Sequence, residues 1–161
     1  KNNPEAITAF LQAFDGNRRI SQETIQKFNK LRTKIIKRWS RNIQKNGISS
    51  CKDFRVLSIG LNAQSDTEYR YAPPIDGPKE KGNFYLWNCN VSEVISSTNF
   101  LCSNFLGIGN FLVDGIEQSF PDSIQQNRVY SIIGKYNRNK TNILNHLIPV
   151  LEDTYVTSCS Q

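Results

Sequence analysis

The sequence predicts an α+β fold in which a long amphipathic N-terminal helix packs on a mainly antiparallel sheet, with a further C-terminal helix. Three observations lead to this prediction. Between residues 21 and 46, apolar side chains recur at helical spacing. Between residues 54 and 134, short apolar runs alternate with glycine- and proline-rich breaks, as in strands. Between residues 140 and 151, spacings of three and four return.

Length and composition favour one monomeric domain spanning residues 1–161. We expect a helical part over 4–46, mainly strands over 54–134, and a helix plus a possible edge strand over 138–158. A hydrophobic content of 38% excludes a disordered chain, because enough apolar surface is available for a core. No apolar run approaches the roughly 20 residues that span a bilayer. Because the chain contains no methionine, we expect a processed chain or a piece of a longer one.

Local signals define the helical part. Pro4 suits the first position of a short helix. Ser21 is a favourable N-cap for the long helix, and the apolar residues Ile20 and Ile25 on either side of it form a hydrophobic staple. Gly47 is suited to the left-handed conformation that ends helices. The long helix is therefore predicted to run from about residue 22 to residue 46.

The long helix is predicted to have two chemically different sides. The apolar stripe contains Ile25, Phe28, Leu31, Ile35, Ile36, Trp39 and Ile43, with Arg32 as an exception within it. The opposite side contains Lys27, Lys30, Lys34, Lys37, Arg38, Arg41 and Lys45. Burying large apolar side chains gains more free energy than lysine repulsion costs, so we expect the stripe to pack across a sheet face.

Several strands are predicted in the first half of the sheet. Phe54–Leu61 is rich in branched residues, and Glu68–Tyr71 alternates charged residues with tyrosine. The connection 72–83 is dense in proline, glycine and charge, so we expect a mobile loop there. Phe84–Trp87 is apolar at every position and predicts a central strand covered on both faces.

The boundaries of strands and helices are less clearly marked in the second half of the chain. Residues 91–113 are apolar but interrupted by glycine, which indicates one or two strands, and Val129–Gly134 predicts another. Lys140–Leu151 has helical spacing, with Pro149 as a bend or a boundary. Tyr155–Thr157 predicts an edge strand.

The four cysteines leave two interpretations open. Cys51, Cys89, Cys102 and Cys159 match no zinc-binding spacing, and only one histidine is present. Their spacing does not decide between buried free thiols and disulfides. Free thiols would favour a cytoplasmic protein, and paired cysteines a periplasmic or secreted one.

Catalytic chemistry has little support. His146, the only histidine, lies at the border of an apolar stripe, so we expect a structural role for it. No nucleophile elbow, zinc-protease motif, phosphate-binding loop or calcium loop occurs. Acidic pairs such as Asp66 and Glu68 lack a partner lysine for metal-dependent phosphodiester chemistry. We therefore expect a non-enzymatic protein without a cofactor or a metal.

The charge distribution indicates an anionic partner. Ten of the twenty Lys and Arg residues lie between Arg18 and Lys45. The predicted polyanion-binding residues are the seven cations of the long helix together with a second group of Arg128, Lys135, Arg138 and Lys140. RNA or DNA is the expected ligand. The alternatives are a solvated helix surface, or an extracytoplasmic interaction or assembly domain that contacts a protein or an anionic membrane surface.

Overall fold

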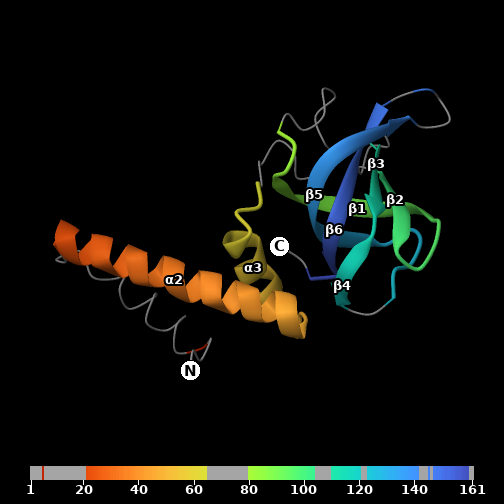
Figure 1. Cartoon of the computed structure of the whole chain (residues 1–161). Coiled ribbons are helices and arrows are strands. Elements are labelled where there is room, and N and C mark those ends of the chain that lie inside the picture. The colour runs from red at the N-terminus through yellow and green to blue at the C-terminus, as the bar shows by residue number, and fades with distance from the viewer. Residues whose placement is uncertain are drawn as a thin grey trace.

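The computed structural model describes residues 5, 21–64, 80–103, 110–120, 123–141, 145 and 147–159. These residues form a mixed α+β structure in which two helices accompany a sheet that closes into a barrel (Figure 1). The helices are α2 (Gln22–Asn46) and α3 (Cys51–Gly60). The strands are β1 (Phe84–Val94), β2 (Asn99–Ser103), β3 (Asn110–Asp114), β4 (Ile116–Phe120), β5 (Val129–Thr141) and β6 (Leu147–Thr157).

The barrel is closed by a parallel pairing between strands that are distant in sequence. The strand order is β3-β2-β1-β5-β6, and β3 pairs with β6 to close the ring. β4 continues from β3 beyond Gly115 and also pairs with β6 in parallel, whereas the other four pairings are antiparallel. The prediction of a mainly antiparallel sheet is therefore confirmed. The five strands of this ring form a closed barrel, an architecture that by itself assigns no function.

Aromatic side chains fill the barrel interior. Residues of β1 alternate between buried and partly exposed, and its inward positions include Tyr85 and Trp87. The Trp87 and Phe111 rings meet edge to face, with centroids 5.1 Å apart. Phe100 and Phe111 have no exposed surface. The barrel interior is therefore a packed core of large aromatic rings, which the strands β1, β2 and β3 supply.

β1 is also apolar on its outer side, as predicted for a central strand. Phe84 and Leu86 point outward and pack against a second core cluster. This cluster, which we call the helix–barrel core, contains the buried residues Ile43, Phe54, Leu57, Ile133 and Tyr155. It joins α2 and α3 to the outer surface of β1, β5 and β6. The predictions of a strand at 84–87, of strands between 91 and 113, and of a strand at 129–134 are all confirmed.

The predicted ends of the long helix are confirmed. The Ser21 side chain accepts a hydrogen bond from the Thr24 backbone N–H at 3.2 Å, as an N-cap should. Gly47 has φ +102°, and its N–H donates to the Ile43 carbonyl at 2.8 Å. Both signals are local and depend on the residue type at one position, so they were readable from the sequence.

The predicted packing of the long helix across a sheet face is wrong. α2 extends away from the barrel, and α3 lies between them (Figure 1). Only the last turns of α2 reach the strands, where the Gln118 side-chain N–H donates to the Ile43 and Gln44 carbonyls at 3.1 and 3.0 Å. A sheet that closes into a small barrel has no flat open face for a helix of 25 residues.

The strand predicted at Phe54–Leu61 is a helix. Ser50 caps α3 by accepting a hydrogen bond from the Asp53 N–H at 3.2 Å. Phe54 and Leu57 are buried and lie three residues apart, which places them on one helical face. The branched residues Val56 and Ile59 resemble a strand, but Ser50 and Asp53 form a helix-start signal that the prediction overlooked.

The helix predicted at Lys140–Leu151 is also wrong. β5 continues to Thr141, and β6 begins at Leu147, with Asn139 opposite Pro149. β3 joins the other side of β6 only at Val150, so Pro149 occupies a part of the strand that pairs on one side. Residues 155–157 are not at an edge, because β6 pairs there with both β5 and β4.

Three predictions fall mainly on parts of the chain that are not described. They are the short helix beginning at Pro4, of which only Glu5 is described, the strand Glu68–Tyr71, and the connection 72–83 up to residue 79. The end of that connection is bound to β5. The Gly82 N–H donates to the Tyr136 carbonyl, and the Tyr136 N–H donates to the Asn83 carbonyl.

Candidate interaction surface

The seven predicted cations of α2 are all exposed along one helix. They are Lys27, Lys30, Lys34, Lys37, Arg38, Arg41 and Lys45. Lys27 forms an ion pair with Glu23 at 3.3 Å, one turn before it. Among the residues that the structure describes, none of the other six forms an ion pair. No described acidic side chain therefore neutralises these six charges.

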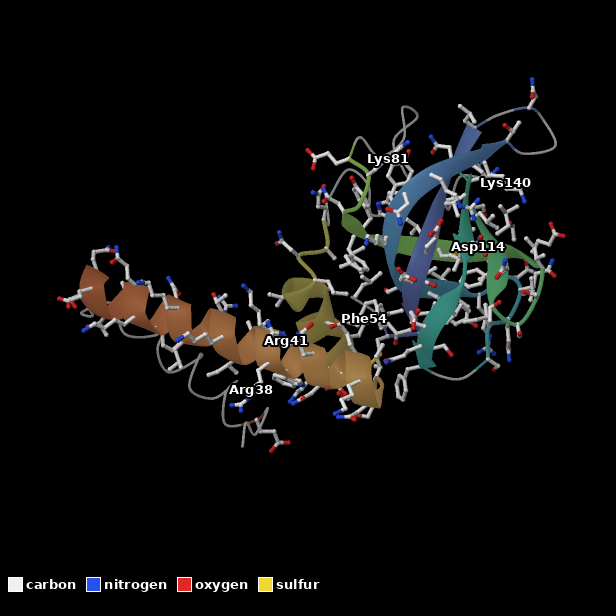
Figure 2. All side chains as sticks on the ribbon, in the orientation of Figure 1. Arg38, Arg41, Phe54, Lys81, Asp114 and Lys140 are labelled. Atoms are coloured by element: carbon white, nitrogen blue, oxygen red, sulfur yellow. A yellow bond between two sulfur atoms is a disulfide. The ribbon has the colours of Figure 1, made fainter. Side chains whose placement is uncertain are left out.

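α2 holds these cations clear of the barrel. Figure 2 shows Arg38 and Arg41 on the helix, well away from Asp114 and Lys140 on the strands. With 25 residues, α2 is about 37 Å long at about 1.5 Å per residue. Arg32 and Leu31, both assigned to the apolar stripe, are exposed as well, whereas Phe28 and Ile43 are buried.

The second predicted group of cations is distributed along β5, and its members differ in burial and in pairing. Arg128 precedes β5 and Lys140 lies near the end of that strand, which has 13 residues and is therefore about 40 Å long. Arg138 is bound to the carboxylates of Glu152, at 2.7 Å, and Asp114. Its hydrogen bond with Glu152 raises the pKa of the Arg138 guanidinium, and the charge of Asp114 acts in the same direction. Lys135 is partly buried. The positive charge of Arg138 is therefore already balanced by carboxylates of the strands β3 and β6.

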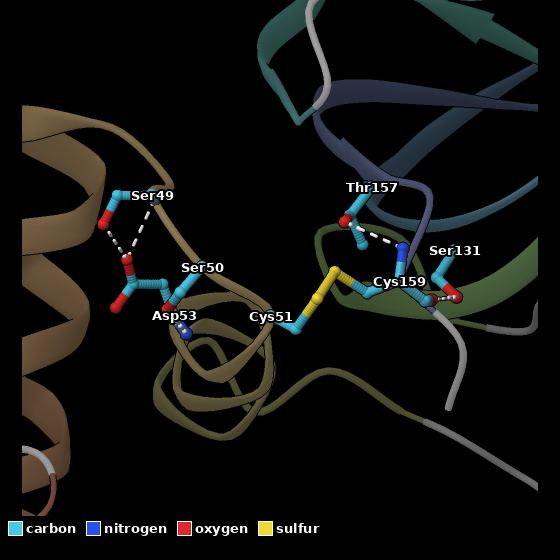
Figure 3. The surroundings of a disulfide bond; sticks show 7 residues. All are labelled: Ser49, Ser50, Cys51, Asp53, Ser131, Thr157 and Cys159. Carbon is cyan, nitrogen blue, oxygen red and sulfur yellow. Dashed lines mark hydrogen bonds between the residues drawn. A yellow bond between two sulfur atoms is a disulfide. The ribbon is translucent and has the colours of Figure 1, made fainter.

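All four cysteines are paired. Cys89 and Cys102 join the neighbouring strands β1 and β2, with Cα atoms 5.1 Å apart. The Cys51–Cys159 bond joins the first residue of α3 to the segment after β6, with Cα atoms 5.7 Å apart and a sequence separation of 108 (Figure 3). The second disulfide therefore fastens the helices to the barrel.

A buried carboxylate sets the angle between the two helices. Asp53 accepts hydrogen bonds from the Ser49 N–H at 3.0 Å and from the Ser49 hydroxyl at 2.8 Å. Its other oxygen accepts from the Trp39 indole N–H at 3.2 Å. Trp39 is half-buried and packs against the helix–barrel core. These contacts fix the turn after α2, and through it the direction in which the cationic helix projects.

Features for other chemistry are lacking in the described part of the chain. Within those ranges no group of three or more His, Cys, Asp or Glu side chains is arranged to hold a metal ion. No described helix has the length and apolar character needed to cross a membrane. His146 and Asp66 lie outside the described residues.

Sequence reasoning missed two residues that position the candidate surface. Gln118 caps the C-terminal carbonyls of α2 from β4, and no local pattern predicts a contact between residues that distant. Asp53 had a readable signal in the Ser50-x-x-Asp53 spacing.

Searches against protein-family models, curated proteins and solved structures found no match to this chain.

Proposed function

We propose that this chain is a non-catalytic interaction domain that works outside the cytoplasm. The observation that supports this proposal is the pairing of all four cysteines in two disulfides. Disulfides persist in oxidising compartments and are rare in cytosolic proteins, where thiols are kept reduced. The alternative, a cytoplasmic binder with free thiols, requires four unpaired cysteines and receives no support from this arrangement.

Thiol counting in the native cell tests this proposal. Thiols are blocked with N-ethylmaleimide at lysis, and the chain is then denatured, reduced and labelled with a second alkylating reagent. The extracytoplasmic proposal predicts that all four cysteines carry the second label. A protein that carries the first label on all four was reduced in the cell, and this result would overturn the proposal. Treating lysates with reductant before the first label provides the control for complete blocking.

A second candidate function concerns the ligand, and the exposed cations of α2 support it. We propose that α2 is an amphipathic helix whose cationic side contacts a polyanion, with RNA or DNA as the expected class. The supporting observation is that six of the seven cations have no acidic partner among the described residues. A merely solvated helix commonly carries acids one turn away from its cations, as only Glu23 does here.

The geometry of α2 suits a phosphate backbone better than base edges. The seven cations, from Lys27 to Lys45, spread over about 27 Å of helix at about 1.5 Å per residue and can contact several phosphates, and each contact releases condensed counterions. Affinity is therefore expected to fall with salt, with a log–log slope of about −0.7 to −0.9 per phosphate contacted. The seven residues are all Lys or Arg, so contacts to the backbone dominate and sequence preference is slight.

Charge reversal on α2 tests this second candidate. The variant Lys30→Glu, Lys34→Glu, Lys37→Glu and Arg41→Glu changes four exposed cations, so we expect it to fold and to lose binding. The matched control reverses four exposed cations elsewhere, at Lys52, Lys81, Arg128 and Lys140. Both variants change the net charge equally, so only a local site distinguishes them.

The readout is fluorescence anisotropy with labelled single- and double-stranded oligonucleotides across a salt series. Binding by wild type and the control, but not by the α2 variant, supports the candidate. An equal loss of oligonucleotide binding in both variants would indicate attraction by net charge alone, and would overturn the proposed site on α2. Binding of anionic phosphatidylserine vesicles without binding of oligonucleotides also overturns it, because the surface would then recognise a membrane.

A further inference from the structure

The two disulfides differ sharply in access. Cys89 and Cys102 have no exposed surface, because they lie inside the barrel core. Cys51 is exposed, and Cys159 is partly exposed. Exchange with a thiol requires the attacking sulfur to reach one sulfur of the disulfide. A reductant can therefore reach the Cys51–Cys159 bond in the folded protein, whereas the other bond requires the barrel to open.

The environment of Cys51 favours its release as a thiolate. Cys51 is the first residue of α3, directly after the N-cap Ser50. The N–H groups of a first helical turn point toward this position and stabilise a negative charge on a leaving sulfur. Lys52 and Arg55 are exposed on the same helix and add positive charge. The Asp53 carboxylate is turned toward Ser49, away from the disulfide (Figure 3).

Both ends of the bond are positioned by contacts that do not involve sulfur. The Cys159 N–H donates to the Thr157 hydroxyl at 3.1 Å, and the Ser131 hydroxyl donates to the Cys159 carbonyl at 3.3 Å (Figure 3). On the other side, Ser50 caps the helix that begins at Cys51. Each thiol therefore keeps its place within its own segment after reduction, so the bond can form again whenever α3 returns to the barrel.

The bond adds a covalent fastening to a limited contact between helices and barrel. The described non-covalent contacts are the helix–barrel core, the Gln118 cap, a weak Gln44–Tyr155 hydrogen bond of 3.5 Å and the pairing of Gln64 with β1. The helix–barrel core touches only the last turns of α2, so α3 is the element that transmits the fastening to the long helix. Loss of the bond is expected to loosen α3 first.

We propose that Cys51–Cys159 is a reversible redox clamp that a dithiol reductant opens while Cys89–Cys102 stays closed. A reductant thiolate attacks Sγ of Cys159, the S–S bond breaks, and Cys51 leaves as a thiolate. The second reductant thiol then attacks the mixed disulfide and releases Cys159. Two electrons and two protons pass to the cysteine pair, and the reductant departs as a disulfide. The clamp does not depend on the ligand of α2.

Selective reduction is the first test. The full chain is incubated with increasing dithiothreitol, quenched with N-ethylmaleimide and mapped by mass spectrometry. Cys51 and Cys159 should be labelled at a reductant concentration about tenfold or more below that needed for Cys89 and Cys102. Removal of dithiothreitol followed by mild oxidation should restore the bond. Labelling of all four cysteines together, or of Cys89 and Cys102 first, would overturn the proposal.

Hydrogen exchange then tests the clamping role. After selective reduction, amides of α3 and of the last turn of α2 should exchange about tenfold faster or more, at exchange times too short to label the core amides of β1 and β5. The double variant Cys51→Ser and Cys159→Ser should reproduce this pattern without reductant. Unchanged exchange in α3 in both samples would show that the bond fastens nothing, and would overturn the clamp.

A charge variant tests the thiolate environment separately. Lys52→Glu together with Arg55→Glu should slow the reduction of Cys51–Cys159 several-fold at constant pH, because the leaving thiolate loses positive neighbours. Lys81→Glu, an exposed change away from α3, should leave the rate unchanged. Equal rates in all three proteins would exclude the proposed stabilisation of the Cys51 thiolate.

Discussion

Trp39 and Asp53 join the two helices through a hydrogen bond of 3.2 Å between the indole N–H and a buried carboxylate. The carboxylate also holds the turn residue Ser49, so one side chain connects α2, the turn and α3. This connection directs the cationic helix away from the barrel. The direction of α2 is therefore set by this polar contact together with the packing of Trp39 and Ile43 in the helix–barrel core.

Asp53→Ala should destabilise the protein by about 1–3 kcal/mol, because the half-buried Trp39 indole N–H and the Ser49 donors lose their acceptor. Trp39→Phe keeps an aromatic ring and removes only the N–H, so it should cost about 1 kcal/mol. Trp39→Ala also removes the packing of the ring, and about 3 kcal/mol is expected for this half-buried side chain. Urea unfolding measures all three. Equal stability of wild type and Asp53→Ala would contradict the role assigned to the carboxylate.

Gly60→Ala should cost about 1–3 kcal/mol, because the added Cβ would overlap the Ser40 side chain where α3 crosses α2. Ile59→Ala, at an exposed position of the same helix, is the control and should change stability by about 0.5 kcal/mol or less. Combining Gly60→Ala with Ser40→Gly removes the overlapping atoms. The double variant should lose less stability than the sum of the single variants, and strict additivity would argue against this crossing.

Removing the exposed disulfide should lower stability more than removing the buried one. Chain entropy predicts about 4.8 kcal/mol for Cys51→Ala with Cys159→Ala, because the bond spans 108 residues. The same relation predicts about 3 kcal/mol for Cys89→Ala with Cys102→Ala, which spans 13 residues. Thermal unfolding without reductant compares the two double variants. The reverse order would show that packing of the buried sulfurs outweighs loop closure.

Stability should fall at alkaline pH because of two buried tyrosines. Burial raises the pKa of the Tyr85 and Tyr155 phenols above their ordinary value. Below pH 10 both phenols are protonated in the folded and unfolded states. Above it the unfolded state loses its protons first, so stability is lost as pH rises through the folded-state values. Urea midpoints at about pH 9 and about pH 11 measure this loss, and Tyr155→Phe should reduce it. An identical loss in the variant would exclude Tyr155 as a contributor.

Arg138→Gln should destabilise the barrel by up to about 1 kcal/mol, because Asp114 and Glu152 would then repel each other without the shared cation. The effect should shrink in high salt, since all three groups are partly exposed. Arg128→Gln is the control, because Arg128 is exposed and has no ion pair among the described residues. A larger loss for Arg128→Gln in low salt would contradict this assignment.

Several signals carried by one or two neighbouring residues were read correctly from the sequence, although the helix start at Ser50 and Asp53 was missed. Ser21 and Gly47 mark the ends of α2, and the doubly apolar run Phe84–Trp87 became a strand with one face in the barrel and the other against the helices. Of the candidate surface, the exposed positions of α2 follow from helical spacing alone. Pairing of the cysteines did not follow, because it depends on which strands become neighbours.

The sequence by itself determined the composition and bounds of the cationic helix and the positions of most of the strands, because capping and apolar periodicity act within a few residues. Tertiary structure alone decided the rest. Lys140–Leu151 has helical spacing, yet pairing with β5 and β3 makes its last residues a strand. Closure between β3 and β6 removed the open face that α2 was expected to cover. Contacts between residues far apart in sequence gain their free energy only once the whole barrel is assembled. Examples are the Gly115–Thr154 hydrogen bond, over 39 positions, and the Cys51–Cys159 disulfide, over 108 positions.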